Sequence, residues 1–142
     1  MEATHRPLIA LVEDEAMDVR HFKRLAKKHA LPNDIEVFEN ADTALAFLRE
    51  TKSAPISRPI LLLTDINMPG MTGHELIEEI RHDPNLQDTV VFVVSTSDLE
   101  TDIRRAYSNC VAGYIVKDAA GVALDESVLM LRHYCDAVTF KT

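Results

Sequence analysis

The strongest constraint on the fold of this chain is a short apolar run, Leu61-Leu62-Leu63, which leads directly to the carboxylate of Asp65. The turn sequence Pro69-Gly70 follows shortly after it. A run this short, closed by Pro-Gly, is typical of a buried β-strand that ends in a turn. Because ligands bind at the carboxyl ends of strands in open parallel α/β sheets, the sequence predicts that Asp65 lies at a reactive edge of a sheet.

Similar apolar runs recur along the chain and alternate with amphipathic helical patterns. Strands are expected at residues 8–12, 35–38, 60–64, 90–94 and 113–116. Helices are expected at residues 16–29, 41–49 and 73–82, from residue 97 onward, and at 122–137. Strands that alternate with helices indicate a parallel sheet joined by right-handed crossovers.

Polar and charged groups follow several of these strands at the point where each strand ends. Glu13 and Asp14 follow the first strand, Ser95 the fourth, and Lys117 the fifth. Carboxylates are the ligands that a hard cation such as Mg²⁺ prefers, and one carboxylate can act as a nucleophile. A lysine and a hydroxyl can neutralise charge on a transferred phosphoryl group. Together with Asp65, the set suits acyl-phosphate chemistry.

At these residues the chain resembles the response-regulator receiver domains of two-component signalling. The matching pieces are Glu13-Asp14, Asp65 to Gly73, Ser95 and Lys117, with 30 residues from Asp65 to Ser95 and 22 from Ser95 to Lys117. The resemblance implies a flavodoxin-like, doubly wound α/β fold with a five-stranded parallel sheet in the order 2-1-3-4-5 and five helices. It also implies one receiver domain over residues 1–142, with a core of about 7–138 and no output domain.

The resemblance assigns expected roles to individual residues. Asp65 is expected to accept a phosphoryl group from a phosphohistidine on a sensor histidine kinase. The expected ligands of Mg²⁺ are Glu13, Asp14, Asp65 and the main-chain carbonyl of Asn67. The expected phosphate-binding and switch residues are Lys117, Ser95, Thr96 and Tyr114. Thr96 is small, which leaves room for phosphate access.

Two positions depart from the family pattern. Glu13 stands where many relatives have Asp, and Asp118 follows Lys117 where relatives have Pro, often after a cis bond. Asp118 in place of Pro supports an alternative function, that of a binding module that acts without phosphorylation. A second alternative, an aspartyl-phosphate hydrolase of the haloacid-dehalogenase type, needs an acid two residues after its aspartate, where this chain has Asn67.

The family role implies a phosphoacceptor signalling protein that helps catalyse its own phosphorylation and dephosphorylation, and not a turnover enzyme. Its output is expected to be a protein contact made by helix four, strand five and helix five. A narrower resemblance is to small regulators that accompany bacterial phytochrome kinases. A homodimer through helix five and the tail at residues 137–140 is a further hypothesis.

Composition limits the partners and the location. The formal net charge of −8 argues against nucleic acid and anionic membranes. No apolar run approaches the length of about 18 residues that spans a bilayer, so the protein is expected to be soluble and cytoplasmic.

The sequence also supports several local expectations. Cys110 and Cys135 are expected to be reduced and buried. The helical histidines 21, 29, 74, 82 and 133 are expected to be solvated. Ser97-Asp98-Leu99-Glu100 matches a capping box for helix four, whose apolar stripe is expected at Leu99, Ile103, Ala106 and Tyr107. Residues 51–58 are expected to form a surface loop.

Overall fold

The computed structural model describes residues 6–52 and 58–141, and in it five parallel strands form one sheet in the order β2-β1-β3-β4-β5. The strands are β1 (Leu8–Val12), β2 (Ile35–Phe38), β3 (Ile60–Thr64), β4 (Val90–Ser95) and β5 (Gly113–Val116). The helices are α1 (Ala16–Lys28), α2 (Ala41–Lys52), α3 (Gly73–His82), α4 (Glu100–Ser108) and α5 (Val122–Ala137). The predicted fold class and strand order are confirmed.

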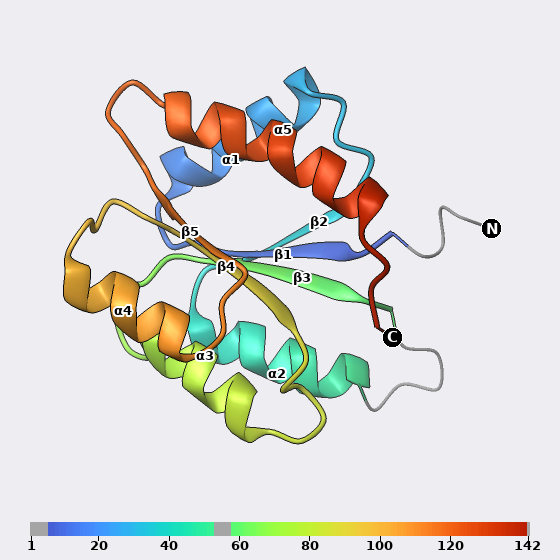
Figure 1. The fold of residues 1–142 in the computed structure, drawn as a ribbon, viewed down its shortest axis with the longest axis vertical. Coiled ribbons are helices and arrows are strands. Elements are labelled where there is room, and N and C mark those ends of the chain that lie inside the picture. The colour runs from blue at the N-terminus through green and yellow to red at the C-terminus, as the bar shows by residue number, and fades with distance from the viewer. Residues whose placement is uncertain (1–5, 53–57, 142) are drawn as a thin grey trace.

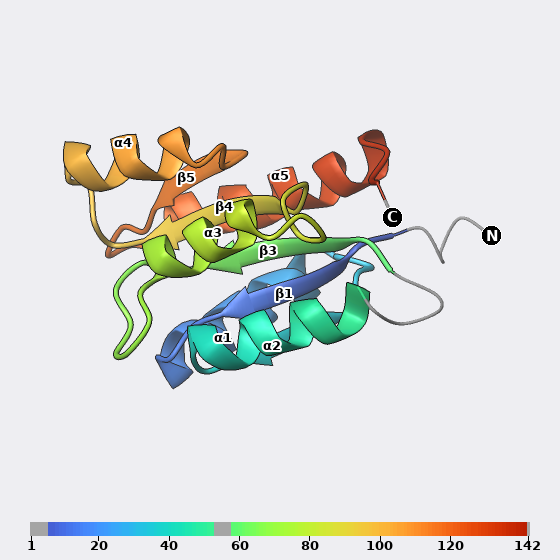
Figure 2. The ribbon, with the colours of Figure 1, turned by 90° about the horizontal axis from the view of Figure 1, so that it is seen from below.

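The helices cover both faces of the sheet. Figure 1 shows α1 and α5 on one face and α2, α3 and α4 on the other, and Figure 2 shows the same layers from below. Every residue of β1 and β3 is buried, because these central strands are covered on both sides. This explains why their sequences are continuous apolar runs and do not alternate. The edge strands β2 and β5 are less covered, and their residues are partly exposed.

Alternate residues of the strands supply two separate cores. Ala10, Leu62 and Val91 pack with α2, α3 and α4, whereas Leu61 and Leu63 pack with α1 and α5. The helices contribute buried apolar residues at helical spacing, including Leu76, Ile77 and Ile80 of α3 and Leu124, Val128, Leu131 and Cys135 of α5.

Helix α4 differs most from its prediction. It begins at Glu100, with Leu99 as an N-cap that makes no side-chain hydrogen bond, so the capping box expected at Ser97 is wrong. Among the expected stripe residues only Ala106 is buried, while Leu99 and Tyr107 are 62% and 50% exposed. The helix therefore rests on the sheet through a small residue and presents large apolar side chains to solvent.

Other local expectations have mixed outcomes. Cys135 is buried as expected, but Cys110 is exposed; both are free thiols. Helix α2 continues to Lys52, so the surface loop expected at residues 51–58 is wrong for residues 51 and 52, and residues 53–57 lie outside the described residues. No helix in the described parts of the chain is long and apolar enough to cross a membrane.

Candidate phosphoacceptor site

Three carboxylates meet at the carboxyl edge of the sheet. One oxygen from each of Glu13, Asp14 and Asp65 lies within 4.8 Å of the others. Glu13 and Asp14 follow β1, and Asp65 follows the neighbouring strand β3, with which β1 pairs from Leu8–Ile60 to Val12–Thr64. The register brings the two strand ends level, so the structure unites the carboxylates as the sequence predicted.

Backbone groups fix the orientation of Asp65. Its amide donates to the carbonyl of Val12 at 3.1 Å. Its Oδ1 accepts hydrogen bonds from the amides of Ile66, at 2.6 Å, and Asn67, at 3.3 Å. The other oxygen, Oδ2, faces the ammonium group of Lys117 at 3.7 Å. The carboxylate therefore has one oxygen held by the backbone and one oxygen turned toward a cation.

A glycine at the start of α3 presses against this loop. The amide of Gly73 donates to the carbonyl of Ile66 at 2.9 Å. A Cβ at this position would lie 2.0 Å from the carbonyl oxygen of Asp65, which is a severe overlap with backbone. Thr72 and Glu75 form a reciprocal capping box that starts the helix at this point, a cap that the sequence analysis did not identify. The first turn of α3 is thus in direct contact with the backbone of Asp65.

Lys117 bridges several acids. Its Nζ lies 3.0 Å from Asp18, 3.2 Å from Glu13 and 3.7 Å from Asp65. Burial lowers the pKa of Lys117, but the nearby carboxylates outweigh burial, and the pKa is raised above its usual value. Lys117 is therefore a firm positive charge beside Asp65.

Asp18 is a residue that the sequence analysis missed. It lies in the first turn of α1, and the only sequence signal was an acidic residue placed shortly after the Glu13-Asp14 pair. Whether it reaches Lys117 depends on the angle of α1 to the sheet, and no local pattern encodes that angle.

The acidic set has the chemistry of a divalent-cation site. Burial raises the pKa of Glu13, Lys117 opposes this, and the neighbouring charge of Asp65 raises the pKa further. All three side chains offer hard oxygen ligands, which is the donor set that Mg²⁺ takes. The residues present fit such an ion, because its charge would relieve the repulsion between their carboxylates.

Two pockets adjoin the carboxylates. The one beside Lys117 has a volume of about 20 Å³, and its lining includes Glu13, Asp18 and Asp65, so it holds about one water molecule. A wider pocket of about 340 Å³ is lined by Glu13 and Asp14 on the side of α1 and β2.

The predicted hydroxyl and aromatic residues lie at the ends of β4 and β5. Ser95 is buried, and its Oγ accepts a hydrogen bond from the amide of Ser97 at 3.1 Å. The hydroxyl of Tyr114 donates to the carbonyl of Ser97 at 2.9 Å. Burial raises the pKa of Tyr114, so this hydroxyl stays protonated as a donor. Thr96, which follows Ser95, is exposed.

The loop after Lys117 has an ordinary backbone. No cis peptide bond occurs among the described residues, so the bond from Lys117 to Asp118 is trans. The Asp118 carboxylate accepts a hydrogen bond from the amide of Ala123 at 3.3 Å, at the start of α5. Asp118 therefore helps to begin α5, and the ion partners of Lys117 are the three acids described above.

One histidine expected to be solvated is buried. His74 in α3 is 3% exposed, and its Nε2 lies 3.1 Å from Oδ1 of Asp102 in α4. The sequence contained a signal for its burial, since His74 precedes the buried Ile77 by three residues on the same helical face. The expectation failed because a histidine was assumed to be polar enough to remain in water.

Comparison with known proteins identifies the family. The response regulator receiver domain family matches residues 9–129. The probable methanogenesis regulatory protein FilR2 of Methanothrix harundinacea is 31% identical, over 94% of this chain and 86% of that protein. Response regulator Rcp1 of Synechocystis is 32% identical, over 82% of this chain and 80% of Rcp1.

Solved structures agree with the sequence matches. The phosphorylated cyanobacterial phytochrome response regulator RcpA superimposes with a TM-score of 0.83 and 32% identity, over 96% of this chain and 99% of that chain. The Mn²⁺-bound form of Rcp1 superimposes with a TM-score of 0.82 and 29% identity, over the same shares of the two chains. Because the family match spans most of the sequence and the relatives exceed 30% identity, this chain belongs to the response regulator receiver domains of two-component signalling.

Proposed function

We propose that this receiver accepts a phosphoryl group on Asp65 from a phytochrome-type histidine kinase, with Mg²⁺ bound by the adjacent carboxylates. The observation that carries the proposal is the position of Oδ2 of Asp65, which faces Lys117 at 3.7 Å inside a cluster of three carboxylates.

We infer that Oδ2 of Asp65 is the attacking atom. The backbone amides of Ile66 and Asn67 occupy Oδ1. Oδ2 attacks the phosphorus of the kinase phosphohistidine, the P–N bond breaks, and its electron pair returns to the imidazole nitrogen, which takes up a proton. The product is an acyl phosphate on Asp65 and a neutral histidine on the kinase.

Lys117 and Ser95 have complementary roles around the incoming group. Lys117 begins as the counter-ion of Glu13, Asp18 and Asp65, and its retained charge attracts the phosphoryl oxygens. The Oγ of Ser95 at the end of β4 accepts from the amide of Ser97, and its own O–H can donate to a phosphoryl oxygen. A shift of Ser95 toward that oxygen is the local event that the phosphorylated state would transmit to β5 and α4.

A divalent cation completes the charge balance. We assign Glu13, Asp14, Asp65 and the main-chain carbonyl of Asn67 as its ligands. When bound, Mg²⁺ neutralises the charge that gathers on the phosphoryl oxygens. The Mn²⁺-bound structure of Rcp1 supports a divalent cation in a related receiver.

The likeness to Rcp1 and RcpA supports a phytochrome-type kinase as the partner, since RcpA is described as a phytochrome response regulator. Output would use the face formed by α4, β5 and α5, where Leu99, Tyr107 and Val122 are exposed. A homodimer through α5 and its tail belongs to the same proposal, because Met130 and Val138 are also exposed there. Light scattering tests the dimer, which a concentration-independent monomer mass would exclude.

The acceptor role is tested by incubating the protein with Mg²⁺ and acetyl phosphate and measuring its intact mass. We expect one added phosphoryl group on the parent and none on Asp65→Asn. The matched control is Asp118→Asn, which changes an exposed aspartate near the site to the same amide and should label normally. Chelation of divalent cations should abolish the adduct.

The outcomes separate the proposal from its rivals. Labelling of Asp65→Asn would show that another residue is the acceptor. No adduct and no Mg²⁺ binding in the parent would favour a phosphorylation-independent module. Continuous release of phosphate from small phosphate esters would favour a hydrolase.

A further inference from the structure

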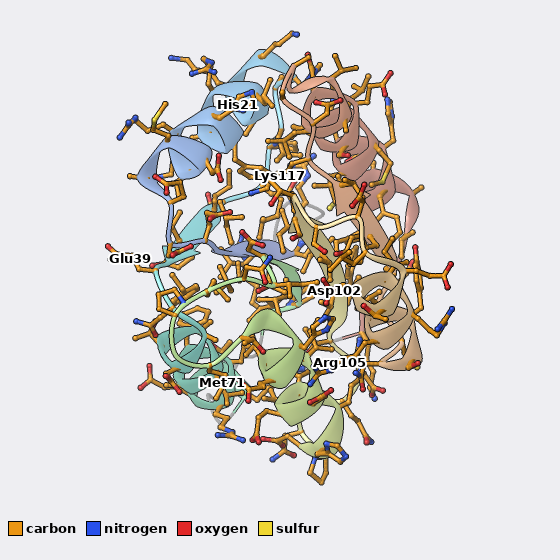
Figure 3. The ribbon with its side chains drawn as sticks, turned by 90° about the vertical axis from the view of Figure 1, so that its left-hand side faces the viewer. His21, Glu39, Met71, Asp102, Arg105 and Lys117 are labelled. Atoms are coloured by element: carbon orange, nitrogen blue, oxygen red, sulfur yellow. The ribbon has the colours of Figure 1, made fainter. Side chains whose placement is uncertain are left out.

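A chain of hydrogen bonds joins α3 to α4 beside the proposed switch. His74 of α3 contacts Asp102 of α4, with Nε2 and Oδ1 3.1 Å apart. The other oxygen of Asp102 accepts a hydrogen bond from Oγ of Ser97 at 2.5 Å. Figure 3 shows Asp102 and Arg105 at the boundary between the two helices. The Ser97–Asp102 bond joins the β4–α4 loop to the first turn of α4, whereas the His74–Asp102 contact joins two different helices.

Ser97 is the centre of this network because all of its polar groups are used. Its amide donates to Oγ of Ser95 at 3.1 Å, and its carbonyl accepts from the hydroxyl of Tyr114 at 2.9 Å. Its own Oγ is oriented toward Asp102 and also lies 3.4 Å from the amide of Leu99. The position of Ser97 therefore decides whether Ser95 and Tyr114 keep their partners.

The burial of His74 points to a specific purpose for its imidazole ring. An ionised carboxylate only accepts hydrogen bonds, so Nε2 of His74 donates to Asp102. The Nδ1 atom is buried and has no hydrogen-bond partner within the described residues. A buried polar atom without a partner costs stability, and an aliphatic side chain would fill this site without that cost. The main contribution of the His74 ring is therefore its hydrogen bond to Asp102, and its packing is secondary.

The charge of Asp102 is consistent with this network. The hydroxyl of Ser97 and then the ring of His74 lower the pKa of Asp102 below its usual value. The carboxylate is thus held ionised as a double acceptor between α3 and the β4–α4 loop.

We propose that His74 and Asp102 are positioning residues that hold Ser97 in the place where Ser95 and Tyr114 bind it. They form a second route from the phosphoacceptor to the α4–β5–α5 face, because His74 follows Gly73, whose amide bonds the carbonyl of Ile66 next to Asp65. The signalling consequence rests on the proposed function, whereas the positioning of Ser97 concerns the unmodified protein.

The test compares amide hydrogen exchange in His74→Leu and the parent by NMR. We expect the Ser97 amide to exchange about tenfold faster in the variant, as for the loss of a hydrogen bond to a charged group. His74→Gln should restore slow exchange, since its amide can donate to Asp102 in the same direction. Asp102→Ala should reproduce the effect of His74→Leu and provides a second variant if the first does not fold.

The matched control is Arg105→Gln, which removes another bridge between α3 and α4. Arg105 binds Glu78 of α3 through Nε at 2.9 Å and a terminal nitrogen at 3.1 Å, and it takes part in none of the hydrogen bonds of Ser97 given above. We expect Ser97 exchange to stay at the parent rate in this variant. Equal acceleration by Arg105→Gln, or parent-like exchange in both His74→Leu and Asp102→Ala, would overturn the proposal.

A second readout separates this inference from the acceptor chemistry. His74→Leu should gain the same phosphoryl adduct as the parent, but the NMR signals of the Tyr114 ring should respond less to phosphorylation. If the parent itself takes no phosphoryl group, the acceptor proposal fails while the exchange comparison still decides the role of His74. A Tyr114 response equal to that of the parent in a phosphorylated His74→Leu protein would refute the signalling role.

Discussion

The contact of Gly73 with the backbone of Asp65 gives a sharp quantitative prediction. A Cβ at Gly73 would lie 2.0 Å from the carbonyl oxygen of Asp65 and 2.8 Å from Cα of Ile66. Both are backbone atoms, so rotation of a side chain cannot relieve the overlap. Overpacking of this kind costs about 3 kcal/mol. Gly73 is the first residue of α3, so the advantage of alanine over glycine in a helix interior offsets little of this cost. We therefore expect Gly73→Ala to lower the free energy of unfolding by about 3 kcal/mol.

The same substitution should also slow the phosphorylation of Asp65, because the overlap displaces the loop that carries this residue. We expect Gly73→Ala to accept a phosphoryl group from acetyl phosphate much more slowly than the parent. Urea denaturation followed by circular dichroism measures the stability, and intact mass against time measures the labelling.

The control is Gly70→Ala. Gly70 has φ +77°, but nothing lies within 4 Å of the position that a Cβ would take there. The left-handed backbone costs a non-glycine residue about 1 kcal/mol, so this variant should lose stability and still label at the parent rate. Parent-like stability together with parent-like labelling of Gly73→Ala would refute a rigid contact between α3 and Asp65.

Three further predictions concern sites away from the phosphoacceptor. Ala30 has φ 53°, so Ala30→Gly should raise the free energy of unfolding by about 1 kcal/mol in urea denaturation. Exposed Cys110 should react quickly with a thiol reagent, while burial raises the pKa of Cys135 to about 11 and should block its reaction until the protein unfolds. Arg105 holds the pKa of Glu78 below its usual value, so the pair stabilises the folded state fully only above that usual pKa. The stability lost in Arg105→Gln should shrink as the pH falls through the folded pKa of Glu78, which urea denaturation across that pH range measures.

The elements could be predicted because their signals are local. The buried strand Ile60–Thr64 reads as a continuous apolar run, and α5 shows its inward face at Leu124, Val128 and Leu131. Helix α4 shows the limit of such patterns. Ser97 matches a capping residue, but its hydroxyl donates to Asp102, and the helix begins at Glu100. Asp102, in the first turn of α4 and five residues after Ser97, takes the hydroxyl that the predicted capping box needed.

The sequence by itself determined the alternation of strands and helices and the polar groups at the end of each strand. Both features depend only on residues that are close together in the sequence. Parallel pairing then brings Glu13, Asp14 and Asp65 together wherever the strands are neighbours. Only the tertiary structure decided that Asp18 shares Lys117 and that His74 is buried against Asp102. These contacts depend on how α1, α3 and α4 pack on the sheet, and the packing of helices is set by the whole core and not by any one segment.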